Sequence, residues 1–456
     1  MTRPAPLSGF PEWLPAGRLL EQSLLDRLRR TFELHGFTPI ETRAVEPLGE
    51  LLRKGETSQE VYVLRRLQEY ADPRARASLT ELDDRQLGLH FDLTVPFARY
   101  VLENAGRLDF PFKRYQIQKV WRGERPQDGR FREFIQADID VVGQGSLPFH
   151  YEVELPLVMA EALAGLPIGR VEVRVNNRKL SQGFYLGLGL TDLTAVLRCV
   201  DKLDKIGPAA VAQLLVDQAQ ASGAQAQACL DLAQIQGGLA DQVGAAVRAL
   251  TDRYGAANDQ LEAGLGELTG LLEAAQAALP GAVVADLKIA RGLDYYTGSV
   301  YESVLEGHQS LGSICSGGRY DSLASDGSQT YPGVGLSIGV SRLVSRLIGQ
   351  DQVQVTRPVP TAVLVAVADE ASRPRSERVA QALRARGVPT DVAPTAAKYG
   401  KQIKFADIRS IPYVWFPGQE DGTDQVKDIR SGQQVEADQR TWSPPADDLW
   451  PRLVAV

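Results

Sequence analysis

Two stretches of alternating polar and apolar residues, "KRYQIQKVWR" at 113–122 and "REFIQADIDVVG" at 132–143, constrain the fold most strongly. Side chains two residues apart lie on the same face of a β-strand, so each stretch has one polar and one apolar face. The apolar faces carry Tyr115, Ile117, Trp121, Ile135, Ala137, Ile139 and Val141. Because a polar loop joins the stretches, the pattern predicts an antiparallel hairpin within a larger sheet.

The polar face of this hairpin has two interpretations. It carries Gln116, Gln118, Arg122, Gln136, Asp138 and Asp140. Antiparallel sheets commonly expose one face to water. This face, however, offers amides and carboxylates in place of the Lys, Thr and Ser of a solvated strand, which favours a recognition surface. The loop that follows the first arm contributes Arg125, Gln127 and Arg130, and Arg132 begins the second arm. The four arginines between 122 and 132 form either a solvated tip or a contact surface for phosphates and bases.

The rest of the chain predicts several further elements. A helix is expected at 15–34, because Pro15 suits a first turn, apolar residues follow at helical spacing, and Gly36 comes just after the end. A strand is expected in "FTPIET". Between 179 and 280 the composition shifts to Ala, Gln, Leu and Gly, which predicts a helical insertion that we interpret as a spacer. Strand patterns return at 283–305 and in "GVGLSIG", which leads into a helix.

The C-terminal part follows a different pattern. After a linker at 351–360, apolar strands alternate with helices from "TAVLVAVA" to "PYVWFPG", which predicts a separate α/β domain at 361–456. We therefore expect an α+β protein whose catalytic domain consists of 1–178 and 281–350, with an antiparallel sheet flanked by helices. The helical insertion at 179–280 interrupts that domain. A length of 456 residues fits two or three domains.

Composition excludes several classes of function. The three cysteines are far apart and the four histidines form no cluster with them, so neither a disulfide framework nor a metal site built from histidine and cysteine is expected. No run of eighteen apolar residues and no signal-peptide pattern occur, so we expect a cytoplasmic protein without a membrane span. The net charge of −7 argues against general nucleic-acid binding but permits a local basic patch.

The stretch "RGLDYYTGSVYE" at 291–302 combines a cation, a glycine turn, a carboxylate and two adjacent tyrosines. Alone, it fits a solvated arginine and a half-buried tyrosine pair as well as a site. His90 is expected to be structural and His308 to be solvated.

Taken together, the motifs resemble those of the histidyl-tRNA synthetase family of class II aminoacyl-tRNA synthetases. "RTFELHGFTPIETRAVEP", "VWRGERPQDGRFREFIQADIDVVG" and "GVGLSIGVSRL" resemble the three class motifs, and "RGLDYY" and "GGRYD" resemble the two histidine-specific signatures. The tail resembles the class II anticodon-binding domain. The resemblance implies a cytoplasmic homodimer that uses ATP and Mg²⁺ to activate L-histidine, releases pyrophosphate, and transfers histidine to the 3′ end of tRNA(His).

The resemblance also implies roles for particular residues. Arg122 contacts the α-phosphate of ATP, Glu124 reads the adenine amino group, and Arg342 holds the γ-phosphate. Arg291 bridges the substrate carboxylate and the α-phosphate, so Arg122 and Arg291 are the implied catalytic residues. The implied histidine-binding residues are Asp92, Thr94, Gln136, Asp140, Arg291, Tyr296 and Tyr320, with Asp92 and Tyr296 at the imidazole and Tyr320 near the ammonium group. Tyr295 is expected to be a packing neighbour.

Recognition of tRNA is assigned to two regions. The family likeness places Arg125, Gln127 and Arg130 of the hairpin loop against tRNA, where the loop reads an extra guanosine at the 5′ end. In the tail, Lys398, Lys401, Lys404 and Arg409 form either an RNA contact, which the likeness favours, or a solvated helix face.

The sequence departs from many bacterial members at three places. "DLTVP" stands where they carry Glu-Gly-Thr, Asp140 where they often carry Glu, and Ser341 where Glu is frequent. The first two departures resemble the eukaryote-like branch.

The alternative function is a histidyl-tRNA-synthetase-like regulatory subunit of ATP phosphoribosyltransferase, which would lack the tail and usually loses the ATP-contact arginines. A synthetase-like domain that binds uncharged tRNA would need partner domains.

Overall fold

The computed structural model describes residues 5–52, 60–68, 86–127, 129–166, 168–290, 292, 295–307, 312–349, 353–418 and 422–455. The chain divides into two compact units, one of Met1–Pro11 with Leu25–Arg346 and the other of Glu12–Leu24 with Leu347–Val456. The first unit thus contains the predicted helical insertion at 179–280 and most of the two predicted catalytic parts, whereas residues 12–24 and 347–350 belong to the second unit. The predicted boundaries at 178, 280, 350 and 360 stay predictions.

A nine-stranded sheet organises the first unit, in the order β1-β5-β6-β12-β11-β10-β7-β9-β8. Its pairs are antiparallel except for β1 with β5 and β7 with β9. The strands are β1 (Thr38–Pro39), β5 (Phe112–Trp121), β6 (Glu133–Val142), β7 (Val171–Asn177), β8 (Gln236–Gly237), β9 (Val283–Asp286), β10 (Ser299–Leu305), β11 (Cys315–Tyr320) and β12 (Gly333–Gly339). Strands β5 and β6 are the predicted hairpin, which is confirmed. The expected strand in "FTPIET" comprises Thr38 and Pro39 alone.

Helices and a small sheet precede, separate and follow these strands along the chain. Helix α1 (Pro15–Leu34) has the predicted bounds, and Gly36 follows it with a φ of 77° that favours glycine. The other elements are α2 (Leu48–Leu51), α5 (Thr94–Asn104), the 3₁₀ helix η4 (Ala105–Arg107), α6 (His150–Ala164) and α14 (Val340–Gly349), with a sheet of β2 (Val45–Pro47), β4 (Leu87–Leu89) and β3 (Val63–Leu64).

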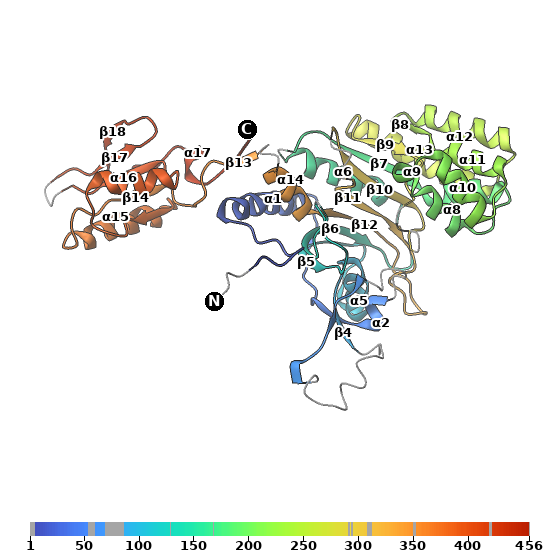
Figure 1. The fold of residues 1–456 in the computed structure, drawn as a ribbon, viewed down its shortest axis with the longest axis horizontal. Coiled ribbons are helices and arrows are strands. Elements are labelled where there is room, and N and C mark those ends of the chain that lie inside the picture. The colour runs from blue at the N-terminus through green and yellow to red at the C-terminus, as the bar shows by residue number, and fades with distance from the viewer. Residues whose placement is uncertain are drawn as a thin grey trace. The chain divides into compact units, whose positions relative to one another are not determined.

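The region predicted as a helical insertion is built mainly of helices. They are α7 (Arg178–Gly187), α8 (Leu193–Val200), α9 (Leu203–Ile206), α10 (Pro208–Ala219), α11 (Gly223–Ala233), α12 (Ala240–Tyr254) and α13 (Asp259–Ala278). Figure 1 shows α8 and α10–α13 gathered beside β7 and β9. The region also supplies β8, which pairs with β9 at the edge of the large sheet.

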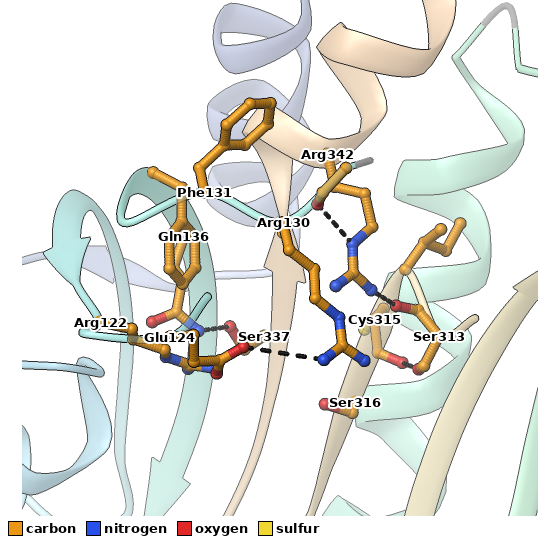
Figure 2. Close-up of a pocket in the computed structure, with 14 residues that line it drawn as sticks. Arg122, Glu124, Arg130, Phe131, Gln136, Ser313, Cys315, Ser316, Ser337 and Arg342 are labelled. Carbon is orange, nitrogen blue, oxygen red and sulfur yellow. Dashed lines mark hydrogen bonds and ion pairs between the residues drawn. The ribbon is translucent and has the colours of Figure 1, made fainter. Parts of the chain in front are cut away.

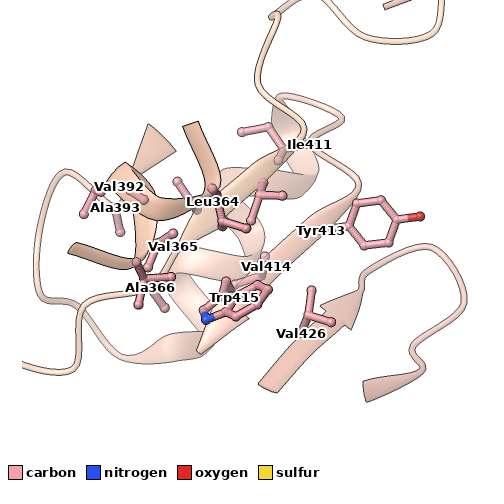
Figure 3. Packing of buried hydrophobic residues seen from close by; sticks show 14 of the residues in the cluster. Leu364, Val365, Ala366, Val392, Ala393, Ile411, Tyr413, Val414, Trp415 and Val426 are labelled. Carbon is pink, nitrogen blue, oxygen red and sulfur yellow. The ribbon is translucent and has the colours of Figure 1, made fainter. Parts of the chain in front are cut away.

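The second unit contains a five-stranded sheet of order β15-β14-β16-β17-β18. Its parallel core of β14 (Val363–Val365), β15 (Thr390–Val392) and β16 (Tyr413–Phe416), with α15 (Arg373–Ala385) and α16 (Tyr399–Ile408), confirms the predicted α/β pattern. Figure 3 shows aliphatic side chains of these strands packed with Trp415. The remaining elements are β17 (Gln425–Asp428), β18 (Gln434–Glu436), α17 (Ala446–Leu449) and the pair β13 (Val353–Val355) with β19 (Leu453–Ala455).

Candidate active site

The polar face of the β5–β6 hairpin lies inside the protein. Strand β12 pairs with the other side of β6, which places Gln116, Asp138 and Ser337 in one row across three strands. Gln116, Gln136, Asp138 and Asp140 are all buried. The interpretation of this face as a solvated surface is therefore wrong. The polar side chains form a buried floor, which we define as Arg114, Gln116, Gln136, Asp138, Asp140 and Ser337.

Asp140 is the centre of this floor. Its Oδ2 lies 2.6 Å from Nη2 of Arg114, whose side chain is 0% exposed, and its Oδ1 accepts a hydrogen bond of 2.8 Å from the Tyr320 hydroxyl. Gly335 stands opposite Asp140 on β12, and a Cβ there would lie 2.0 Å from Asp140 Oδ1. The glycine is therefore needed to make room for the carboxylate.

The second carboxyl of the floor, Asp138, has an altered acidity. Its pKa is raised to about 7, mainly by burial and also by the charge of Asp140, although the nearby Arg114 acts to lower it. Gln136 donates a hydrogen bond of 2.8 Å to the Ser337 hydroxyl. Burial also raises the pKa of Tyr320 well above its ordinary value, so this phenol remains a hydrogen-bond donor at neutral pH.

Asp92 and Tyr296 approach the same floor from other elements. Asp92 is buried just before α5, where its Oδ1 accepts a hydrogen bond of 3.1 Å from the Val95 amide. The pKa of Tyr296 is raised well above its ordinary value by burial, then by Tyr295, and also by the charges of Asp140 and Asp92. Five predicted histidine-binding residues thus converge on one region of the structure: Asp92, Gln136, Asp140, Tyr296 and Tyr320.

Glycines create the space that Tyr296 occupies. A Cβ at Gly292 would lie 1.9 Å from the Tyr296 ring, and one at Gly318 would lie 2.9 Å from it. Tyr295 packs against Tyr296 with ring centroids 4.2 Å apart, as its predicted role as a packing neighbour requires. Thr94 is half-buried and begins α5 two residues after Asp92.

A pocket rich in arginine adjoins the floor. It is lined by Arg122, Glu124, Arg130, Gln136, Ser337 and Arg342, among others. Figure 2 shows Arg122 and Arg130 beside the Glu124 carboxylate, and Arg342 beside Ser313. Because Gln136 belongs to both the pocket and the floor, the two are neighbouring parts of one site.

Backbone carbonyls orient two of these arginines. Arg122 donates from Nε to Phe91 O at 2.9 Å, and its guanidinium lies over the Phe134 ring, 5.1 Å from the centroid. Arg342 donates to Gly129 O at 3.0 Å and to Ser313 O at 2.6 Å. Glu124 lies 3.8 Å from both Arg122 and Arg130. The pocket thus offers an excess of fixed positive charge, which suits a polyphosphate.

The loop at the hairpin tip is exposed. Gln127 and Arg130 exchange backbone hydrogen bonds of 3.3 and 2.9 Å around Gly129, whose φ is 68°. Arg125, Gln127 and Arg130 are all exposed, whereas Asp128 lies outside the described residues. The tight turn presents three long polar side chains to solvent.

The predicted catalytic Arg291 and the predicted solvated His308 lie outside the described residues. His90 is buried, with Nε2 2.7 Å from Lys119 O, and desolvation lowers its pKa, which supports the structural role predicted for it. Within the described ranges, no group of three His, Cys, Asp or Glu side chains is arranged to hold a metal ion. None of the described helices is both long and apolar enough to cross a membrane.

Sequence reasoning missed two parts of the floor. Arg114 is in phase with Gln116 and Gln118 in the period-two pattern, and that signal could have placed it on the polar face. Ser337 lies in "GVGLSIG", where it is the one side chain with a hydroxyl, but its place beside Asp138 depends on the register of β12 with β6.

Comparison with known proteins gives the family. A family model described as Histidyl-tRNA synthetase matches residues 9–343, and one described as Anticodon binding domain matches residues 361–440. The chain belongs to the histidyl-tRNA synthetase family. Similar family members include a histidine–tRNA ligase of Micrococcus luteus, 57% identical with 99% of each chain covered, and one of Thermobifida fusca, 50% identical with 97% of this chain and 98% of the relative covered.

Solved structures share this fold. The crystal structure of histidyl-tRNA synthetase from Nostoc sp. PCC 7120 is 35% identical, with a TM-score of 0.83 over 96% of this chain and 97% of that one. A Bacillus halodurans C structure titled ATP phosphoribosyltransferase regulatory subunit/histidyl-tRNA synthetase is 18% identical, with a TM-score of 0.70 over 88% of this chain and 96% of that one, and shows the fold alone.

Proposed function

We propose that this protein activates L-histidine with ATP to form histidyl-adenylate and pyrophosphate, and then transfers histidine to the 3′ end of tRNA(His). The observation that carries this proposal is the continuity of the buried polar floor with the arginine-lined pocket through Gln136. A small polar substrate on the floor would have its carboxylate beside phosphates held in the pocket. The family membership and the tail that matches an anticodon-binding model favour this function over the regulatory-subunit alternative.

The proposed activation step needs electrostatics more than acid–base chemistry. The carboxylate of histidine is already ionised at neutral pH, so the site has to hold it in line with the α-phosphate and stabilise the charge that develops. We assign the α-phosphate to Arg122 and the γ-phosphate to Arg342, with Arg291 bridging the carboxylate and the α-phosphate. The carbonyls that fix Arg122 and Arg342 pre-orient both guanidinium groups for this task.

We propose that Mg²⁺ accompanies ATP. Mg²⁺ usually binds one or two carboxylates together with substrate phosphates, and Glu124 supplies a carboxylate among the pocket arginines. The residues present therefore fit an ion that arrives with the nucleotide and screens its phosphates. Glu124 is also the residue assigned to the adenine amino group, and it would serve one of these roles.

The floor would recognise histidine at both ends. Asp140, Gln136 and Thr94 are assigned to the α-ammonium group, with Tyr320 near it through its hydrogen bond to Asp140. Asp92 and Tyr296 are assigned to the imidazole. A buried site of hydrogen-bonding groups rejects an analogue that lacks the matching nitrogens by roughly 10⁴- to 10⁵-fold, because its own polar groups would remain unpaired.

We assign tRNA contacts to the hairpin loop and to the tail. Arg125, Gln127 and Arg130 are proposed to contact the acceptor end. Lys398, Lys401, Lys404 and Arg409 are exposed on and around α16, as an RNA-binding surface would require. We further propose a cytoplasmic homodimer that pairs through the first class motif, and light scattering at micromolar concentration would reveal a monomer if this is wrong.

The test of the proposed function is ATP–pyrophosphate exchange with each of the twenty amino acids in turn. Histidine alone should support exchange. Exchange that depends on another amino acid, or on none, would end the proposal.

A further inference from the structure

Residues 176–179, at the junction of β7 and α7, contact two different parts of the molecule in alternation. The side chains of Asn176 and Arg178 point to the segment that leads to Tyr296. Those of Asn177 and Lys179 reach α13 of the helical region. We call residues 176–179 the junction.

Asn176 and Arg178 hold backbone carbonyls before, within and after the signature "RGLDYY" at 291–296. Asn176 is buried and donates from Nδ2 to Leu287 O at 3.2 Å and to Ile289 O at 2.8 Å. Arg178 is buried and donates from Nη2 to Gly292 O at 3.0 Å, and its amide donates to Gly298 O at 2.8 Å. The segment is thus fixed on both sides of Tyr296.

Gly292 O is the carbonyl that also fixes the backbone of Tyr296. The Tyr296 amide donates to it at 3.2 Å, and the Tyr296 ring occupies space that only a glycine at 292 leaves open. Arg178 therefore contacts the turn that positions Tyr296. This contact suits a residue that positions another one.

The second pair is held by one carboxylate of α13. Glu267 accepts a hydrogen bond of 2.8 Å from Asn177 Nδ2 at Oε2 and one of 2.5 Å from Lys179 Nζ at Oε1. Asn177 also caps α7, because its Oδ1 accepts from the Lys179 amide at 2.9 Å. A single side chain on α13 thus fixes the start of α7, where Arg178 lies.

Close packing makes this connection stiff. A Cβ at Gly264 of α13 would lie 2.2 Å from the Leu180 amide nitrogen, and one at Gly183 of α7 would lie 2.4 Å from the Leu261 amide nitrogen. The two helices therefore touch through their backbones. A displacement of α13 therefore moves α7 with it, because closely packed elements transmit a shift.

We propose that Glu267 and Arg178 are positioning residues for histidine binding, and that the junction couples the helical region to the Tyr296 side of the site. The helical region then acts as more than a spacer. Any ligand of that region that shifts α13 changes histidine affinity by the same factor by which histidine changes the affinity of that ligand. The inference rests on the proposed function, since histidine is taken as the substrate.

The test uses the full chain in histidine-dependent pyrophosphate exchange. Glu267→Ala should raise the KM for histidine on the order of 10-fold, the size expected from loss of one charged hydrogen-bonding group, with the KM for ATP within about twofold of the parent. Glu273→Ala, an exposed glutamate on the same helix, is the matched control and should leave both constants unchanged. Equal increases in both constants for Glu267→Ala, or no change in either, would overturn the proposal.

Two further variants separate coupling from general loosening of the fold. Glu267→Gln keeps an acceptor for Asn177 but loses the ion pair with Lys179, so its KM for histidine should lie between those of the parent and Glu267→Ala. In a double-mutant cycle of Glu267→Ala with Arg178→Met, the KM should rise no further than in the more affected single variant. If the fold-changes in KM of the two single variants multiply in the double variant, the proposed coupling through the junction is wrong. If the parent itself shows no histidine-dependent exchange, the proposed function fails instead.

Discussion

In the five-stranded sheet of the second unit, the central strands β14 and β16 bury Val363, Leu364, Val414 and Trp415 completely. In the nine-stranded sheet of the first unit, the neighbouring strands β5 and β6 bury Arg114, Gln116, Asp138 and Asp140 on one face. Both sets of side chains are removed from water, but their chemistry is opposite.

The difference separates stability from function. Apolar burial stabilises a sheet by about 25 cal/mol per Å² without any need for exact partners. Buried charges cost free energy unless they are paired, and a well-packed apolar replacement is often at least as stable. The C-terminal sheet therefore has the composition that stability alone favours. Stability does not explain the composition of the polar floor. Its function does, because shifted pKa values such as that of Asp138 are typical of functional sites.

Breaking the buried ion pair should have the largest effect. Arg114→Met leaves the Asp140 carboxylate buried without its cation, and such a change typically costs about 3–5 kcal/mol. We expect a loss of that size in the free energy of unfolding of the first unit, together with loss of histidine-dependent exchange. Denaturant unfolding and exchange assays measure the two effects, with the exposed Arg107→Met as control. A variant as stable and as active as the parent would show that the ion pair of Arg114 with Asp140 has no central role.

A cavity in the apolar sheet should affect stability alone. Leu364→Ala removes a side chain that is 0% exposed on β14, an interior strand of its sheet, which typically costs about 2–5 kcal/mol. We expect the second unit to unfold at a lower denaturant concentration than in the parent. Tryptophan fluorescence measures this transition, because the second unit contains Trp13, Trp415, Trp442 and Trp450. Histidine-dependent exchange should remain within about twofold. The exposed Val435→Ala is the control, and a large loss of exchange in Leu364→Ala would show that the two sheets do not divide their roles in this way.

The exposed end of the hairpin should contribute to tRNA choice without affecting activation. Gln127→Ala is expected to leave pyrophosphate exchange nearly unchanged and to narrow the preference for tRNA with the extra 5′ guanosine by roughly 1–3 kcal/mol, the usual value of one base contact. Aminoacylation of tRNA with and without that guanosine measures the preference. Gln144→Ala, exposed just beyond β6 at the opposite end of the hairpin, should change neither. An undiminished preference in Gln127→Ala would exclude this loop contact.

The smallest expected effect is a pH dependence of stability at Asp138. Its pKa is about 7 in the folded protein against an ordinary value of 3.8, so the folded state retains a proton that the unfolded chain has lost between these values. Stability from this group is therefore present at low pH and is lost as pH rises toward 7 and above.

Asp138→Asn cannot lose that proton and should show the difference. Relative to the parent, its free energy of unfolding should increase by roughly 1–2 kcal/mol between pH 5.5 and pH 7. Denaturant unfolding at both pH values measures the shift, with Asp109→Asn at an exposed position as control. A difference that stays constant with pH would mean that Asp138 is ionised throughout.

Much of this architecture could be predicted because its signals are local. The helix at 15–34 has an N-terminal proline, helical spacing of apolar residues and a glycine just beyond its end, and it was found with the predicted bounds. The hairpin arms were predicted from period-two alternation, and the residues of the polar face were assigned correctly to one side. The expected strand in "FTPIET" was too long, because only two of its residues pair with β5.

By itself, the sequence determined the elements, the fold class and the family, since propensity, periodicity and motif order act over short stretches of chain. The tertiary structure decided that the polar face is buried, since burial depends on what covers a sheet. It also decided that Arg114 pairs with Asp140, that Gly335 clears the space beside them, and that Glu267 reaches the junction. These contacts join residues distant along the chain, and their partners are fixed by strand register and helix packing, which no local pattern encodes.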